Sequence, residues 1–118
     1  MILIQDYKSF LETRTFTRIW NAMGLTDGDL LRLQLNIIAA PDSAPVVQGC
    51  GGVRKVRFTS AGSSKGKSGS YRCVYRHLKT HGIIVLILAY PKSKQENISE
   101  TDKKRIAALL AEIENDLK

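Results

Sequence analysis

Residues 71–90 read YRCVYRHLKTHGIIVLILAY, and this stretch decides the fold. Its first part, Tyr71–Leu78, is rich in aromatic and β-branched residues and predicts a strand. Lys79-Thr80-His81-Gly82 has the composition of a turn. Ile83–Tyr90 is apolar at every position, which predicts a central strand covered on both faces. The stretch therefore predicts a β-hairpin inside a larger sheet.

A third strand is predicted before this hairpin. From Val53 onward the hydrophobic period is two, because Val56 and Phe58 alternate with Lys55, Arg57 and Thr59. Such alternation is typical of a strand with one buried face. Residues 9–12 are a candidate for a fourth, short strand.

Helices are predicted before and after the strands along the chain. Thr15–Met23 carries its apolar residues on one helical face and is followed by Gly24. Thr26 and Asp29 have the spacing of a capping box, which begins a second helix that ends before Pro41. Ser99 begins a third, with Asp102 at the capping-box position.

The order of these elements predicts an α+β fold. We expect one domain over residues 1–118, with an antiparallel sheet of three to four strands. Two N-terminal helices and one C-terminal helix pack against that sheet in this interpretation. The longest apolar run has eight residues and no secretory signal is recognisable, so we expect a cytoplasmic protein without a membrane span.

Charge is distributed unevenly along the chain. The formal net charge is +7, and no acidic residue lies between Ser43 and Gln95. Ten basic residues fall in that interval: Arg54, Lys55, Arg57, Lys65, Lys67, Arg72, Arg76, Lys79, Lys92 and Lys94. A field of one sign destabilises the compact state by self-repulsion, so it indicates an anionic partner more than a solvated surface.

Few other residue types in this region offer chemistry. Tyr71, Tyr75 and Tyr90 are candidates for base stacking if they share a groove, although tyrosines in strands more often belong to the core. Cys73 and His77 would lie roughly 13 Å apart on a strand, so we expect no metal and no other cofactor. With no carboxylate nearby in the sequence, any reaction here has to use Lys, Arg, Tyr or His side chains.

Several stretches, in their order along the chain, resemble the HigB-like branch of the RelE superfamily of type II toxins. They are a glycine-rich turn into a basic strand (QGCGGVRKVR, 48–57), a loop (KGKSG, 65–69), a strand with Arg before Tyr (YRCVY, 71–75) and the ending Tyr90-Pro91-Lys92. The resemblance covers most of the chain. It implies a compact RelE-like fold.

The resemblance also implies an activity and its residues. It implies a metal-independent endoribonuclease, an mRNA interferase, that enters the ribosomal A site and cuts messenger RNA by attack of a ribose 2′-hydroxyl on the adjacent phosphate. A cognate antitoxin, encoded by an adjacent gene, is the implied partner. The candidate catalytic residues are Lys65, Lys67, Arg72, Tyr90 and Lys92, and the candidate RNA-binding residues are Arg54, Lys55, Arg57, Arg76 and Lys94. We assign Arg72 to phosphate stabilisation, Lys67 to proton transfer, and Lys92 with Lys94 to RNA positioning.

Two alternatives remain open at the level of sequence. In the first, the chain is an inactive toxin relative that binds nucleic acid or its antitoxin without cutting RNA. In the second, it is a scaffold whose basic residues bind an acidic protein. RNA cleavage separates the first alternative from the nuclease. Tight protein binding with little affinity for nucleic acid distinguishes the second.

Overall fold

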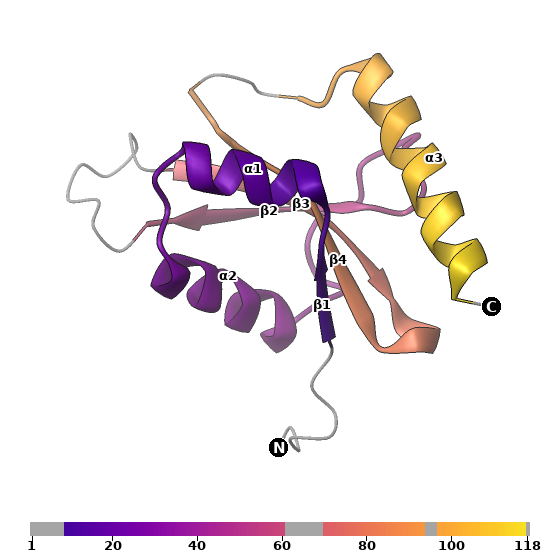
Figure 1. Ribbon diagram of the computed structural model, residues 1–118, viewed down its shortest axis with the longest axis horizontal. Coiled ribbons are helices and arrows are strands. Elements are labelled where there is room, and N and C mark those ends of the chain that lie inside the picture. The colour runs from indigo at the N-terminus through magenta and orange to yellow at the C-terminus, as the bar shows by residue number, and fades with distance from the viewer. Residues whose placement is uncertain (1–8, 61–69, 94–96, 118) are drawn as a thin grey trace.

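A computed structural model of the chain describes residues 9–60, 70–93 and 97–117 (Figure 1). The elements in chain order are β1 (Ser9–Glu12), α1 (Arg14–Ala22), α2 (Asp27–Ala39), β2 (Arg54–Thr59), β3 (Ser70–Leu78), the short 3₁₀ turn η3 (Lys79–His81), β4 (Ile83–Pro91) and α3 (Glu100–Asp116). This order confirms the predicted α+β class. Lys65, Lys67 and Lys94 lie outside the described residues.

The four strands form one mixed sheet in the order β1-β4-β3-β2. β2 pairs antiparallel with β3, and β3 pairs antiparallel with β4, as predicted. β1 instead runs parallel to β4, so the expectation of a purely antiparallel sheet is corrected at this edge. The reason is the crossover between β1 and β2: α1 and α2 return the chain to its starting end, so both edge strands run in the same direction.

Helices cover both faces of the sheet. On one face, here called the α1–α2 face, Phe16, Trp20, Leu33 and Ile37 pack against strand residues that include Phe58, Cys73 and Tyr75. On the other, the α3 face, Ile106 and Leu110 pack against residues that include Val53, Val74 and Val85. In Figure 1, α3 (yellow) accordingly lies apart from α1 and α2 (indigo and purple). The free thiols of Cys50 and Cys73 belong to different faces, and both are buried.

β4 is the central strand that its sequence predicts. Ile84 and Leu86 belong to the core of the α1–α2 face, whereas Val85 and Ile87 belong to the core of the α3 face. All four are at most 3% exposed. A strand covered on both faces has no side chain to present to water, which explains its uninterrupted apolar run.

One irregularity in β4 changes the face of the sheet on which each side chain of its C-terminal half lies. The register with β3 shifts between Val74, which pairs with Leu88, and Tyr75, which pairs with Leu86. Ile87 is therefore an extra residue in β4, a β-bulge. Because one inserted residue reverses the in-out alternation, every residue of β4 after the bulge is on the opposite face from the one that simple alternation predicts.

Side-chain caps fix the helix starts where the sequence predicts them. The Thr26 hydroxyl accepts from the Asp29 N–H at 3.1 Å, and an Asp29 carboxylate oxygen accepts from the Thr26 N–H at 3.0 Å, which completes the capping box. The Ser99 hydroxyl accepts from the Asp102 N–H at 3.1 Å and caps α3. In the described part of the chain, no helix is both long and apolar enough to span a membrane.

Candidate nucleic-acid interface

The register sorts the basic side chains of the sheet between its two faces. Lys55 pairs with Val74, and Arg76 pairs with Val85, both residues of the α3-face core. Arg54 pairs with Tyr75, a residue of the α1–α2-face core. Since directly paired residues share a face, Lys55 and Arg76 belong to the α3 face and Arg54 does not.

Two arginines and a tyrosine form a row across three strands on the α3 face. Arg57 of β2 pairs with Arg72 of β3, and Arg72 pairs with Tyr90 of β4. Directly opposed residues in a sheet have Cβ atoms about 5 Å apart. We call Arg57, Arg72 and Tyr90 the arginine row. It lies at the end of the sheet where β2 stops, β3 begins and β4 ends.

Hydrogen bonds hold the Arg72 guanidinium at this end of the sheet. Its Nη1 donates to the Ser70 hydroxyl at 3.2 Å and to the Tyr71 carbonyl at 3.3 Å. Among the described residues, neither Arg57 nor Arg72 has a carboxylate partner. Like charges directly opposed in a sheet are destabilising, and no carboxylate of the described residues offsets the repulsion between Arg57 and Arg72.

Tyr90 lies beneath the surface at the end of the row. It is 4% exposed, and its hydroxyl has no hydrogen-bond partner among the described residues. Burial raises the pKa of this phenol, while the neighbouring Arg72 charge lowers it and does not cancel the effect. The group is therefore protonated at neutral pH, so it can donate a hydrogen bond or a proton but cannot act as a general base.

Lys92 follows the row directly after Pro91. Its side chain is exposed, and its backbone N–H donates to the Ser70 carbonyl at 3.1 Å, which continues the β3–β4 ladder by one residue. Lys92 is thus tied to the same residue that holds Arg72. The structure places Lys92, Arg72 and Tyr90 together, and Arg57 joins them.

Two predicted RNA-binding arginines are not part of this group. Arg54, on the α1–α2 face, donates from Nη1 to the Ala44 carbonyl at 2.7 Å. Arg76 lies farther along β3, where its Nε donates to the Gly51 carbonyl at 3.1 Å and its Nη2 is 3.9 Å from the Glu114 carboxylate. Both side chains are engaged in internal contacts.

The tyrosines do not share a groove. Tyr75 is 1% exposed in the α1–α2-face core, and its hydroxyl donates to the Pro41 carbonyl at 2.8 Å. Tyr71 stacks on Phe58 of the same face, with ring centroids 5.3 Å apart. Tyr90 lies on the other face. The base-stacking alternative is therefore wrong for the three tyrosines as a set, and the core interpretation is confirmed for Tyr75.

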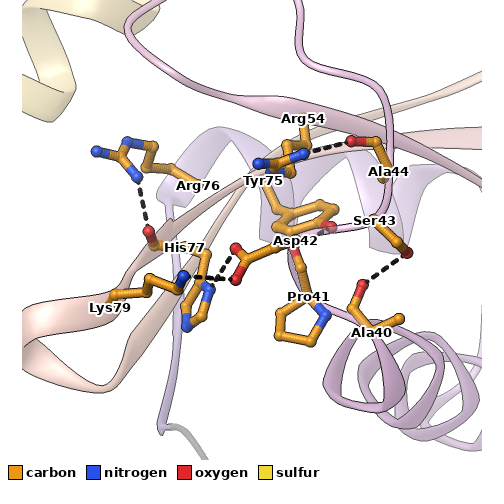
Figure 2. Close-up of polar contacts among 10 residues, drawn as sticks. All are labelled: Ala40, Pro41, Asp42, Ser43, Ala44, Arg54, Tyr75, Arg76, His77 and Lys79. Carbon is orange, nitrogen blue, oxygen red and sulfur yellow. Dashed lines mark hydrogen bonds and ion pairs between the residues drawn. The ribbon is translucent and has the colours of Figure 1, made fainter.

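A second polar cluster lies on the α1–α2 face, where the segment after α2 meets β3 (Figure 2). His77 Nδ1 is 2.9 Å from one Asp42 carboxylate oxygen, and Lys79 Nζ is 3.1 Å from the other. The hydrogen bond with His77 is the main cause that lowers the pKa of Asp42, followed by that with Lys79. The sequence placed no carboxylate near the basic region, and this was wrong, because Asp42 and Glu114 return to Lys79 and Arg76 through the tertiary fold.

This cluster anchors the segment after α2 to β3, and the Asp42 carboxylate already pairs with both of its basic side chains. His77 is 6% exposed, and its Nε2 has no partner in the described part of the chain. Within the same residues, no group of three His, Cys, Asp or Glu side chains could hold a metal ion. The arginine row is therefore the better candidate for binding a nucleic acid.

Comparison with known proteins identifies the family of this chain. The family model described as the RelE toxin of the RelE/RelB toxin–antitoxin system matches residues 8–117. The chain belongs to the RelE toxin family. A solved structure of the toxin RelE from E. coli, a double arginine-to-alanine mutant in the free state, matches with a TM-score of 0.53 and 16% identity, over 76% of this chain and 88% of that chain. That likeness supports the compact RelE-like fold.

The register groups the candidate site residues differently from the sequence-based prediction. Arg57 was predicted to bind RNA and was not counted among the candidate catalytic residues, and the register sets it opposite Arg72. If β3 and β4 paired residue by residue from the turn, where Leu78 pairs with Ile83, Arg72 would stand opposite Ala89. Only the bulge at Ile87 brings Tyr90 to Arg72, and no glycine or other sequence signal marks that bulge.

Proposed function

We propose that this RelE-family protein is a ribosome-dependent, metal-independent endoribonuclease that cuts messenger RNA and thereby inhibits translation. The reaction is attack of a ribose 2′-hydroxyl on the adjacent phosphate, with loss of the 5′-oxygen of the next nucleotide. The products are a cyclic phosphate and a free 5′-hydroxyl. The protein acts as a single domain in the cytoplasm and binds messenger RNA in the ribosomal A site.

The arginine row is the observation that carries the proposal. Arg57 and Arg72 stand directly opposite each other on adjacent strands, and neither has a carboxylate partner among the described residues. A phosphate bound between them relieves their mutual repulsion and accepts hydrogen bonds from both. In the transition state the phosphorane carries additional negative charge, which the same two groups stabilise more strongly than the ground state.

The remaining roles are assigned by position and protonation state. Tyr90 keeps its proton at neutral pH, so we assign it to donate a hydrogen bond toward the reacting phosphate or the leaving oxygen. Lys92 positions the RNA strand beside Arg72. The general base is assigned to Lys67, with Lys65 as the alternative, and both lie outside the described residues.

A cognate antitoxin is the second proposed partner. The matching family description names a toxin–antitoxin system, which supports an antitoxin for this chain as well. An acidic segment of that antitoxin would neutralise the α3 face in the way that we propose for RNA. Occupation of the arginine row by antitoxin carboxylates would then prevent RNA binding.

The test is inducible expression of wild type and of Arg72→Ala in a bacterial host, followed by mapping of messenger RNA 5′ ends. We expect growth arrest with cuts confined to translated transcripts. In the Arg72→Ala variant we expect cutting to fall by about a hundredfold or more, the usual cost of losing one oxyanion-stabilising donor. Circular dichroism of the purified variant checks that it is folded.

Two outcomes would refute parts of this proposal. Full cutting by a folded Arg72→Ala variant refutes the role of the arginine row. Normal growth with uncut transcripts, from folded wild-type protein, refutes the nuclease and favours the non-catalytic binding module.

A further inference from the structure

A pocket of about 280 Å³ lies at the junction of three segments that are distant in sequence. It is lined by Pro45, Val46, Val47, Gln48, Lys55, Asn97, Ile98 and Lys103. These residues come from the chain before β2, from β2 itself, and from the N-terminal end of α3 with the two residues shortly before it. The volume is close to the lower limit of small-molecule pockets, about 300 Å³, so the pocket suits a single compact ligand group.

Backbone hydrogen bonds make one wall of the pocket rigid. The Val47 N–H donates to the Val53 carbonyl at 2.9 Å, and the Lys55 N–H donates to the Pro45 carbonyl at 3.0 Å. Val46 forms an isolated antiparallel bridge with Arg54. Residues 45–47 therefore extend the sheet beside the start of β2, and the pocket is formed before any ligand binds.

The lining combines three chemical features. Val46 is a large apolar side chain that is 53% exposed, next to Pro45 and the partly buried Val47. The amide of Gln48 offers hydrogen-bond donors and an acceptor. Lys55 and Lys103 supply positive charge, and none of the lining residues is acidic. Among the described residues Lys103 has one acidic contact, the Glu100 carboxylate at 3.3 Å, whose side chain is 84% exposed, so this i,i+3 pair is worth little.

Lys55, which lines the pocket, lies close to the arginine row along β2. Lys55 and Arg57 are two residues apart and share the α3 face, so their Cα atoms are separated by about 7 Å. A chain of phosphates that occupies the arginine row therefore meets Lys55 next in that direction. Lys103 lies across the pocket from β2, on α3.

We propose that this pocket binds one flanking nucleotide of single-stranded RNA, next to the nucleotide at the arginine row. The apolar side chains contact the faces of the base, the Gln48 amide hydrogen-bonds its edge, and Lys55 and Lys103 bind its phosphate. The proposal rests on the proposed function in taking RNA as the ligand of the row. It adds a subsite that contributes affinity and base preference without touching the reacting phosphate.

An RNA nucleotide fits this lining better than an acidic protein segment does. Carboxylates explain the two lysines, but they leave the exposed Val46 and the amide of Gln48 without a role. A nucleotide uses all three features at once, because it joins an apolar base face, a polar base edge and a phosphate. The acidic segment is therefore the competing outcome of the test.

The experiment measures binding without cleavage, using 2′-O-methyl RNA hexamers, which lack the attacking hydroxyl. We compare Lys103→Gln with Lys104→Gln, a matched control on the same helix whose side chain is exposed and does not line the pocket. We expect Lys103→Gln to weaken binding about three- to tenfold and to lower the slope of log K against log salt by about 0.7, the value for one phosphate contact in single strands. Lys104→Gln should change the slope by much less.

A second variant tests the base contact separately. Wild type should discriminate among homopolymeric hexamers, and Gln48→Ala should reduce that discrimination about fivefold while the salt slope stays the same. Lysine acetylation provides a readout that needs no variant: hexamer binding should protect Lys55 and Lys103 more than Lys104.

The outcomes separate this proposal from the proposed function. Equal effects of Lys103→Gln and Lys104→Gln, or no protection of Lys55 and Lys103 by the hexamers, overturn the subsite even if messenger RNA is cut. Protection by an acidic peptide instead of RNA overturns it in favour of a protein ligand. Selective protection by RNA in a protein that cuts no message supports the subsite and refutes only the nuclease.

Discussion

Arg54 and Arg57 lie three residues apart on β2 but on opposite faces of the sheet, so their alanine variants should fail in different ways. Arg57 is exposed, stands opposite Arg72 and has no internal partner among the described residues. Arg54 is half-buried and donates a hydrogen bond of 2.7 Å to the Ala44 carbonyl. From the sequence alone, both are predicted to lie in one basic strand and to bind RNA.

The expected magnitudes follow from these contacts. Arg57→Ala breaks no hydrogen bond among the described residues, and it relieves one like-charge repulsion. The free energy of unfolding of this variant should therefore stay within about 0.5 kcal/mol of wild type. Its messenger RNA cutting should fall by about ten- to a hundredfold, which corresponds to roughly 1.4 to 2.7 kcal/mol of transition-state stabilisation. Arg54→Ala loses a charge-assisted hydrogen bond worth about 1.5 kcal/mol, so its Tm should fall by roughly 5 °C with cutting preserved.

The assay pairs thermal unfolding with quantification of cut transcripts per folded protein after induction. A result in which both variants lose cutting to the same extent refutes the assignment of the active surface to the α3 face. So does a stable Arg54→Ala variant that no longer cuts, because nothing on the α1–α2 face would then account for the loss.

Two further predictions concern the contacts that hold the segment after α2 to β3. Tyr75→Phe leaves the Pro41 carbonyl without its buried donor and should cost about 1 to 2 kcal/mol, whereas Tyr71→Phe, which loses no hydrogen bond among the described residues, should be nearly neutral in urea unfolding. Asp42→Asn should cost about 1 kcal/mol at neutral pH, a figure reduced because the carboxylate is 41% exposed. The pKa of Asp42 is lowered in the fold, chiefly by the His77 hydrogen bond, so its stabilisation is present above the ordinary value of 3.8 and lost as pH falls below it. Wild-type and Asp42→Asn unfolding curves should therefore converge as pH falls through the lowered pKa of Asp42, and a difference that persists once this carboxyl is protonated would contradict the ionic origin of the effect.

Local patterns in the sequence predicted most of the secondary structure. The alternation over Val53–Thr59, the apolar run of Ile83–Tyr90 and the capping box at Thr26 each depend on neighbouring residues in the chain, and each is confirmed. Backbone sterics and solvent exposure act over a few residues, so a single sequence records them directly. The family resemblance added the expectation of a RelE-type fold, which the family match confirms.

Pairing between distant segments was not available to such reasoning. The parallel direction of β1 follows from a helical crossover, and a strand of four residues carries no signal of direction. Asp42 reaches His77 across 35 positions of the chain, so a segment without acidic residues still acquired a carboxylate. The catalytic roles of all five candidates remain predictions: Lys65, Lys67, Arg72, Tyr90 and Lys92.

The sequence by itself determined the α+β class, the helix starts, the central strand and the cationic character of the region that we propose as the RNA site. The tertiary structure alone decided which cations face one another, because a single extra residue at Ile87 reverses the alternation of β4 and brings Tyr90 to Arg72. A bulge is a property of two paired strands and their packing, and neither strand specifies it alone.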